Sequence, residues 1–243
     1  MSKLRRKFGR FITSTIGGGY ALGEGLRQDN SRVDYAKARA LYDNNDENYK
    51  LGAGFSKRVI NAKAGFMGVP SFNSDDAAAK ETLDAFFEGQ VSKMARTHIK
   101  ALSEGDCFVW LTREETDRVL YPESGARLVY TIIPNEEVVG INRDPITRQV
   151  KEYVLKSTLD WTDEDGSSRC SKVTQWISAE RRLVRIEGDL IPGLKAEQEI
   201  PNPWGFLPIE HFKNEGNEMM LFGQSDLEPI EPFLKAYHDV MLY

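Results

Sequence analysis

Apolar positions in the first hundred residues recur at steps of three and four, which is typical of amphipathic helices. One helix is expected to begin near Ser31, where Ser31 and Asp34 form a capping-box pattern, and to end at Asn44. A second helix is predicted over residues 55–66. The strongest pattern predicts one long amphipathic helix over residues 75–102, with Ser74 as its N-cap. Gly89 weakens this helix and favours a bend in it. Phe87 lies on the apolar stripe of this long helix, so we expect its ring in the core.

The period changes to two at Cys107, which indicates strands. Turn residues such as Arg143-Asp144-Pro145 separate the alternating stretches. These short connections favour hairpins, and therefore an antiparallel sheet. The predicted strands cover residues 107–113, 127–134, 137–142, 148–155, 172–178 and 181–187.

The last part of the chain returns to a helical pattern. Residues 207–212 predict a short extended piece, which Pro208 would keep at a sheet edge. A final helix begins after Ser225 or as late as Pro232, because proline is tolerated only in the first turn. The order of elements predicts an α+β fold. We expect a mobile, basic and Gly-rich segment over residues 1–30, followed by one domain over residues 31–243.

Composition narrows the possible functions. The net charge is −5 over 243 residues, whereas a DNA-reading domain is usually basic. No apolar run reaches the roughly 18 residues that a membrane-spanning helix needs, so we expect no membrane partner. The basic start, from Lys3 to Arg10, fits a solvated terminus or a contact with an acidic surface.

Candidate chemistry is sparse in this sequence. The two cysteines, Cys107 and Cys170, and the three histidines, His98, His211 and His238, lack metal-ligand spacing. The acidic cluster at residues 160–165 is typical of a solvated hairpin turn rather than a calcium loop. We therefore predict no catalytic, cofactor-binding or metal site and no enzymatic activity, and we assign no residue to nucleic-acid binding.

Four stretches, taken in order, carry a resemblance to a known family. They are residues 48–70, ending in Gly-Phe-Met-Gly-Val-Pro; residues 98–110, where a helix passes through a Gly-Asp turn into a strand; residues 132–139; and residues 205–230, which contain Gly-Gln-Ser-Asp-Leu-Glu-Pro-Ile. This series resembles the portal proteins of long-tailed bacteriophages and prophages over about residues 35–240. The matching part corresponds to the N-terminal wing portion of a portal subunit.

The resemblance implies a structural role in the virion. Portal subunits assemble as a ring, usually of twelve, at one capsid vertex. Double-stranded DNA passes through the channel during packaging and ejection without sequence-specific binding. The implied partners are further copies of the chain, the terminase, the scaffold and major capsid proteins, and the head-tail connector proteins. The implied location is the virion, or the host cytoplasm during assembly. Portal proteins are about twice this length, so the stem, clip and crown would follow Tyr243.

Three other classes stay open at this point. A head-tail adaptor or minor capsid protein would share these partners without needing a stem. A small soluble enzyme would have Cys107 as its best nucleophile, with His98 as the nearest histidine in sequence. A DNA-binding protein with this charge is expected to bind weakly and to release DNA as salt rises.

Overall fold

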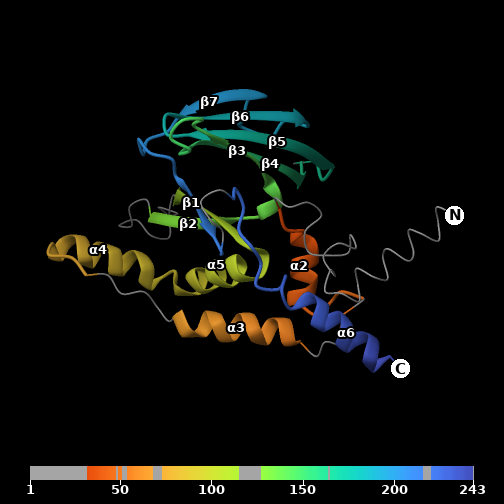
Figure 1. Ribbon diagram of the computed structural model, residues 1–243. Helices are drawn as coiled ribbons and strands as arrows, with labels where there is room; N and C mark the ends of the chain where they lie inside the picture. The colour runs from red at the N-terminus through yellow and green to blue at the C-terminus, as the bar shows by residue number, and fades with distance from the viewer. Residues whose placement is uncertain are drawn as a thin grey trace. The chain divides into compact units, whose positions relative to one another are not determined.

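The computed structural model describes residues 32–47, 49–50, 54–67, 73–114, 127–163, 165–215 and 220–242. These residues form helices α2 to α6 and strands β1 to β8, which is the α+β class expected from the sequence (Figure 1). They divide into two compact units. Phe108–His211 forms one, here called the sheet unit, and the described residues on either side of it form the other, the helical unit. The expected mobile segment 1–30 lies outside the described residues.

Helices α2 and α3 begin the helical unit. Helix α2 spans Tyr35–Tyr42, and the side chain of Asp34 caps it by accepting a hydrogen bond from the amide of Lys37. The expected cap residue Ser31 lies outside the described residues. Helix α3 spans Phe55–Met67, in agreement with the periodicity. Ile60 is the fully buried residue of its inner face.

The predicted single long helix is wrong, because the chain forms two shorter helices there. Helix α4 spans Ala77–Glu88 and helix α5 spans Val91–Glu104. Gly89 caps the C-terminus of α4, and the Gln90 side chain donates to the carbonyl of Phe86 over 3.0 Å. Glycine loses more backbone entropy in a helix than any other residue, which favours the break at this position. The N-cap of α4 is Asp76, which accepts hydrogen bonds from two backbone amides, and not Ser74.

The apolar stripe across α4 and α5 is buried only at its C-terminal end. No residue of α4 is buried, and Phe87 is partly exposed, so its expected place in the core is also wrong. Helix α6 spans Glu231–Met241, with proline in its first turn as predicted. The core of the helical unit joins α2, α3, α5, α6 and the segments beside them through Val33, Tyr35, Ala38, Leu41, Tyr49, Ile60, Leu102, Leu227 and Leu234.

The first sheet has three strands in the order β2-β1-β8. Strand β1 spans Asp106–Glu114 and pairs antiparallel with β2, Arg127–Ile133. Strand β8 spans Ile209–Lys213 and lies at the edge, as Pro208 predicted. The carbonyl of Pro208 accepts a hydrogen bond from the amide of Leu111 over 2.8 Å. Proline has no backbone N–H to donate, so Pro208 contributes to the sheet only as an acceptor.

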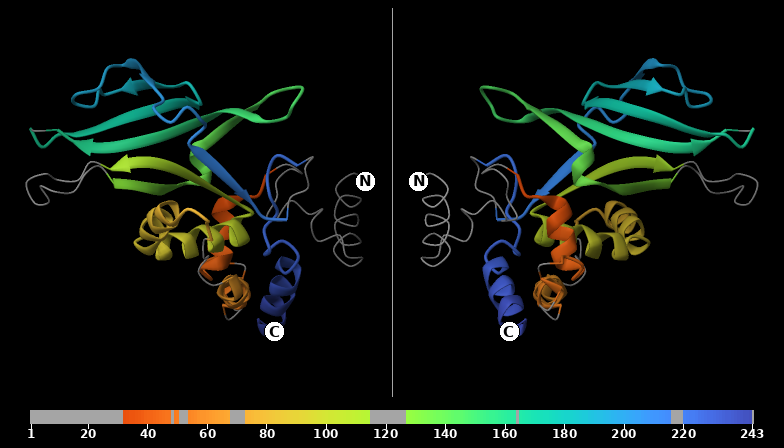
Figure 2. Two further views of the ribbon diagram at one scale, coloured as in Figure 1. Left: turned by 90° about the vertical axis from the view of Figure 1, so that its left-hand side faces the viewer. Right: turned by 90° about the vertical axis from the view of Figure 1, so that its right-hand side faces the viewer.

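The second sheet has five strands in the order β3-β4-β5-β6-β7, and each strand is antiparallel to its neighbours (Figures 1 and 2). A short 3₁₀ turn, Asn135–Glu137, leads into it. The sequence predicted its strands except β7, which is short and carries little apolar alternation. The strands are β3 Val138–Arg143, β4 Val150–Thr162, β5 Ser168–Ser178, β6 Arg181–Gly188 and β7 Glu197–Pro201.

Alternation along these strands places one set of side chains in the core of the sheet unit. Tyr153 and Leu155 of β4 are buried on the same face as Ile177 of β5, which lies opposite Tyr153 in the register. Phe108 of β1 is fully buried and meets the Tyr153 ring edge-on, with ring centroids 5.9 Å apart. The His211 ring stacks on Phe108 at 4.1 Å. The rings of Phe108 and Tyr153 therefore join the two sheets of this unit.

Candidate functional site

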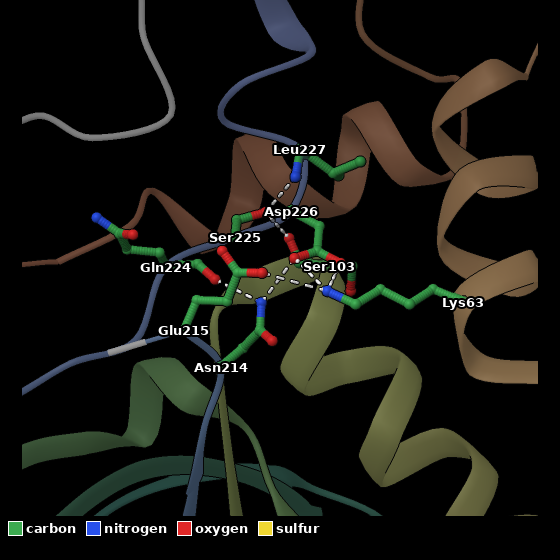
Figure 3. A network of polar contacts seen from close by, with 8 residues as sticks. All are labelled: Lys63, Ser103, Asn214, Glu215, Gln224, Ser225, Asp226 and Leu227. Atoms are coloured by element: carbon green, nitrogen blue, oxygen red, sulfur yellow. Dashed lines mark hydrogen bonds and ion pairs between the residues drawn. The ribbon is translucent and has the colours of Figure 1, made fainter. Parts of the chain in front are cut away.

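A network of hydrogen bonds in the helical unit gathers residues that lie far apart in the sequence (Figure 3). It connects the end of α5, the segment after β8 and the segment before α6. We call this network the polar junction. Its members are Tyr35, Lys63, Ser103, Gly105, Asp106, Asn214, Gly223, Gln224, Ser225 and Asp226.

The end of α5 depends on a glycine in the left-handed region. Gly105 has φ +86° and donates its amide hydrogen bond to the carbonyl of Ala101 over 2.8 Å. Only glycine adopts this conformation without strain. A Cβ at Gly105 would also lie 3.0 Å from the backbone of Gln224 and Ser225. The turn and the incoming segment are therefore in direct backbone contact.

Gly223 makes an even closer approach. A Cβ there would lie 2.0 Å from the carbonyl oxygen of Gly105 and 2.8 Å from backbone atoms of Asn214. No real side chain tolerates such distances to backbone. Gly223 is therefore required by packing, and its amide donates to Oδ1 of Asp106 over 2.8 Å.

Asp106 is fully buried and is held from two sides. In addition to Gly223, the hydroxyl of Tyr35 donates to its Oδ2 over 2.8 Å. Burial, together with the neighbouring Asp106, raises the pKa of Tyr35 well above its ordinary value. The phenol therefore stays protonated and remains a donor. This pair connects α2 to the turn after α5.

Ser225 joins the two segments through its hydroxyl. The hydroxyl donates to the carbonyl of Ser103 and accepts from the amide of Leu227 over 3.1 Å. The amide of Asp226 donates to the carbonyl of Leu102 over 2.9 Å. The last carbonyls of α5 lack intrahelical partners, and this segment satisfies two of them. The Ser225–Glu228 stretch, which was expected to cap the last helix, thus forms a separate turn before α6 begins at Glu231.

Asn214 holds the same segment from the other side. Its amide donates to the carbonyl of Gly105 over 2.9 Å, and its carbonyl accepts from Gln224 over 2.7 Å. Its side-chain amide donates to the carbonyl of Gln224 over 2.8 Å and to Asp226 over 2.9 Å. One asparagine therefore makes four hydrogen bonds within the junction.

Lys63 of α3 completes the network at its exposed side. Its Nζ lies 2.8 Å from Oδ2 of Asp226 and 3.4 Å from Glu215. The hydrogen bond to Asp226 raises the pKa of Lys63. Lys63 is half exposed, so we expect about 1 kcal/mol or less from this pair.

The geometry of the polar junction indicates a structural role. Its hydroxyls, carboxylates and amides bond to one another and to the backbone, so their chemical effect is to fix three chain segments. Residues 48–70, 98–110 and 205–230, which the sequence singled out separately, each contribute members. No local pattern indicates that Gly223 faces Asp106, since the two residues are separated by 117 positions.

The enzyme candidate Cys107 has the properties of a core residue. Its side chain is fully buried, and burial raises its pKa to about 12. At neutral pH it is therefore a thiol, whereas a nucleophilic cysteine must be partly thiolate and accessible. Burial and the nearby charge of Lys63 lower the pKa of His98, so this histidine is mainly neutral at pH 7.

The other candidates lie in separate places. His211 stacks on Phe108, and His238 is in the last turn of α6. Of the predicted acidic turn, Asp160 belongs to strand β4 instead. Asp163 pairs with Arg169 at 3.2 Å, and its backbone carbonyl accepts a hydrogen bond from the amide of Gly166, as expected for a hairpin turn. Glu164 lies outside the described residues. Among the residues that the structure describes, no three histidine, cysteine or acidic side chains are grouped so that they could hold a metal ion.

Two of the acidic side chains in residues 214–243 take part in contacts inside the helical unit. Glu231 is buried, accepts from the hydroxyl of Tyr49 over 2.8 Å and pairs with Lys37 at 2.8 Å. Asp226 belongs to the polar junction. Both carboxylates therefore serve packing in the helical unit. The basic start of the chain and its Gly17–Gly19 run lie outside the described residues.

Neither the models of known protein families nor the sequences of curated proteins match this chain. Within the described residues, no helix combines the length and the apolar character that crossing a membrane requires.

Proposed function

We propose that this chain is a subunit of a bacteriophage or prophage portal ring, and that it forms the wing portion of that subunit. In this role it is a structural protein and not an enzyme. The ring occupies one capsid vertex, passes double-stranded DNA during packaging and ejection, and receives the terminase and the head-tail connector proteins.

The convergence at the polar junction is the observation that carries this proposal. Three of the four portal-like stretches contribute to it, through Lys63, through Ser103 and Asp106, and through Asn214 and Gly223. Chance similarities at distant positions have no reason to meet in space. The fourth stretch, residues 132–139, includes the buried Asn135 and Val138 of the sheet unit.

An exposed apolar face on α3 and α6 supports assembly with other copies. On α3, Phe55, Val59, Ala62 and Phe66 follow steps of four, three and four residues, and all four are exposed. On α6, Phe233, Tyr237 and Val240 follow steps of four and three. The Phe55 and Tyr237 rings meet at 6.2 Å, so the two stripes are continuous.

This face has the spacing with which helices pack against further helices. Phe66 is 91% exposed and Phe233 is 74% exposed, which is unusual for aromatic rings of a folded chain. Exposed apolar patches of this kind mark interaction sites. In a ring, each subunit uses two different surfaces, and the contact closes if its rotation fits.

Electron microscopy of the complete gene product tests the proposal. We expect closed rings with a central channel, and sedimentation at the mass of a multimer. A double variant, Phe233→Ser with Val240→Ser, should weaken assembly. The variant Leu190→Ser, which changes an exposed residue of the sheet unit, should not. A uniform monomer, even with scaffold and major capsid protein present, would exclude a portal and leave the adaptor class as the better account.

A further inference from the structure

A pocket in the sheet unit has the composition of a protein-binding site. Its volume is about 400 Å³, within the usual range for ligand sites. Trp110, Ile177 and Trp204 contribute apolar surface, and Arg182 contributes the positive charge. Tryptophan and arginine are the residues most enriched at the energetic centres of protein interfaces.

Arg182 is the unusual member of this pocket. Its Cζ lies 4.9 Å from the centroid of the Trp110 ring, and its Nε donates to the side chain of Gln175 over 2.9 Å. Burial lowers its pKa. Among the described residues, no carboxylate lies within ion-pair distance of this guanidinium. Arg182 is only partly exposed, and removing part of a guanidinium from water without an anion is costly, which favours an anionic ligand.

Its neighbours on β6 show the contrast. Arg181 pairs with Glu199 at 3.1 Å, and Arg185 pairs with Glu197 at 3.5 Å, across the β6–β7 pairing. Strand alternation points Arg182 to the other face, which it shares with the buried Val184 and Ile186. Arg181 and Arg185 therefore have carboxylate partners on the neighbouring strand, whereas Arg182 lies in the pocket without one among the described residues.

The loop beside the pocket is fixed before any ligand arrives. The Asn202 side chain donates to the carbonyls of Ser178, Ala179 and Phe206 and accepts the amide of Trp204 over 3.1 Å. Pro201 and Pro203 flank it and restrict the backbone further. A rigid wall lowers the ordering cost of binding.

We propose that this pocket binds an acidic segment of a partner protein, with a glutamate or aspartate on Arg182 and an adjacent apolar side chain between Trp110 and Trp204. A planar guanidinium can bind a carboxylate with two parallel hydrogen bonds. A single cation in an apolar setting fits one carboxylate better than a nucleic-acid backbone, which is bound through several phosphate contacts. The site does not depend on the portal assignment.

Peptide titration tests the assignment, with tryptophan fluorescence as the readout. The probes are acetylated, amidated hexapeptides that contain Leu-Glu-Phe, matched versions with Gln or Lys in place of Glu, and phenylacetate as a small carboxylate. We expect the Glu peptide to bind wild-type protein at least tenfold more tightly than the Gln peptide. The Lys peptide and phenylacetate should bind more weakly still.

Three variants locate the effect. Arg182→Met should remove the preference for Glu over Gln, while the protein keeps or gains thermal stability because a partly buried charge, with no carboxylate partner in the described part of the chain, is gone. Arg185→Gln, which changes a paired arginine on the same strand, should leave the preference intact. Trp204→Ala should weaken the Glu and Gln peptides alike. Thermal melting of each variant shows that it is folded.

Several results would overturn the proposal. They are equal affinity for the Glu and Gln peptides, no measurable peptide binding, an unchanged preference in Arg182→Met, and phenylacetate binding as tightly as the peptide, which would indicate a small-molecule site. Displacement of the peptide by a DNA oligonucleotide would indicate a phosphate site. Self-association that Arg182→Met abolishes would make a second copy the occupant.

Discussion

The amide of Gly223 donates a 2.8 Å hydrogen bond to the carboxylate of Asp106, across 117 positions of sequence. The hydroxyl of Tyr35 reaches the other oxygen of the same carboxylate. One buried side chain thus holds α2, the turn after α5 and the segment before α6 in place. Four predictions test this arrangement and its surroundings.

Replacing Gly223 should be far more damaging than replacing an ordinary glycine. Gly223→Ala places a methyl group against the backbone of Gly105 and Asn214, so we expect a loss of about 1–3 kcal/mol or more in unfolding free energy. Gly65→Ala is the control, since nothing lies within 4 Å of a Cβ there and alanine favours a helix by about 0.5–1 kcal/mol. Urea unfolding measures both. Equal stability of the two variants would contradict the close approach.

The Tyr35–Asp106 pair should show coupling in a double-mutant cycle. Tyr35→Phe leaves a buried carboxylate oxygen without its donor, which costs about 1–3 kcal/mol. Asp106→Ala should cost more because it also frees the amide of Gly223. The double variant should lose less than the two single losses together, by about 0.5–3 kcal/mol. Tyr42→Phe, whose hydroxyl bond to Asn61 is exposed, should change little. Strict additivity would show that the pair does not interact.

Two phenylalanines should differ sharply when truncated. Phe108→Ala removes a fully buried ring from its contacts with Tyr153 and His211, and we expect a loss of about 3–5 kcal/mol. Phe87→Ala affects a partly exposed ring on a helix without buried residues, so the loss should be well below that range. Thermal or urea unfolding compares them. A larger loss at Phe87 would restore the core position that its sequence pattern suggested.

The two cysteine thiols should differ in their reactivity towards a thiol reagent. Cys170 is exposed and Cys107 is buried, so a thiol reagent should modify one cysteine per folded chain and two in denaturant. Cys170→Ser should abolish the reaction of the folded protein. Rapid modification of Cys107 in that variant would reopen the enzyme hypothesis.

The raised pKa of Cys107 gives this contrast a second readout. Because its folded pKa of about 12 exceeds the ordinary value of 9.0, its contribution to stability is complete below pH 9 and is lost as pH rises towards 12. Above pH 9, wild type should lose up to about 1.4 kcal/mol per pH unit relative to Cys107→Ala. Parallel stability curves of the two proteins between pH 8 and pH 10 would contradict this burial.

Local patterns predicted most of the elements because local forces decide them. Helix α3 and strands β1 and β2 followed directly from apolar period and turn residues. The sequence indicates a weak point at Gly89 but not a complete break, because the apolar stripe continues past this residue, whereas the helix does not. Strand β7 was missed because a five-residue edge strand with Glu197 and Glu199 has no apolar alternation.

The site could be predicted only in parts. The Gly105–Asp106 turn and the Gly223–Glu228 stretch are both visible in the sequence, but their contact depends on tertiary packing that no local pattern encodes. Arg182 shows the same limit. Its charge suggests a solvated side chain, whereas the strand register sets it opposite Ile200 instead of a glutamate, and tertiary packing places it over the Trp110 ring.

The helical unit takes its core residues Leu227 and Leu234 from beyond the sheet unit, which occupies Phe108–His211. The ribosome therefore synthesises α2, α3 and α5 more than a hundred residues before the segment that completes their core. During that interval the sheet unit can finish folding, while the nascent helices still present apolar surface. Premature termination before residue 223 would leave a folded sheet attached to helices that cannot close.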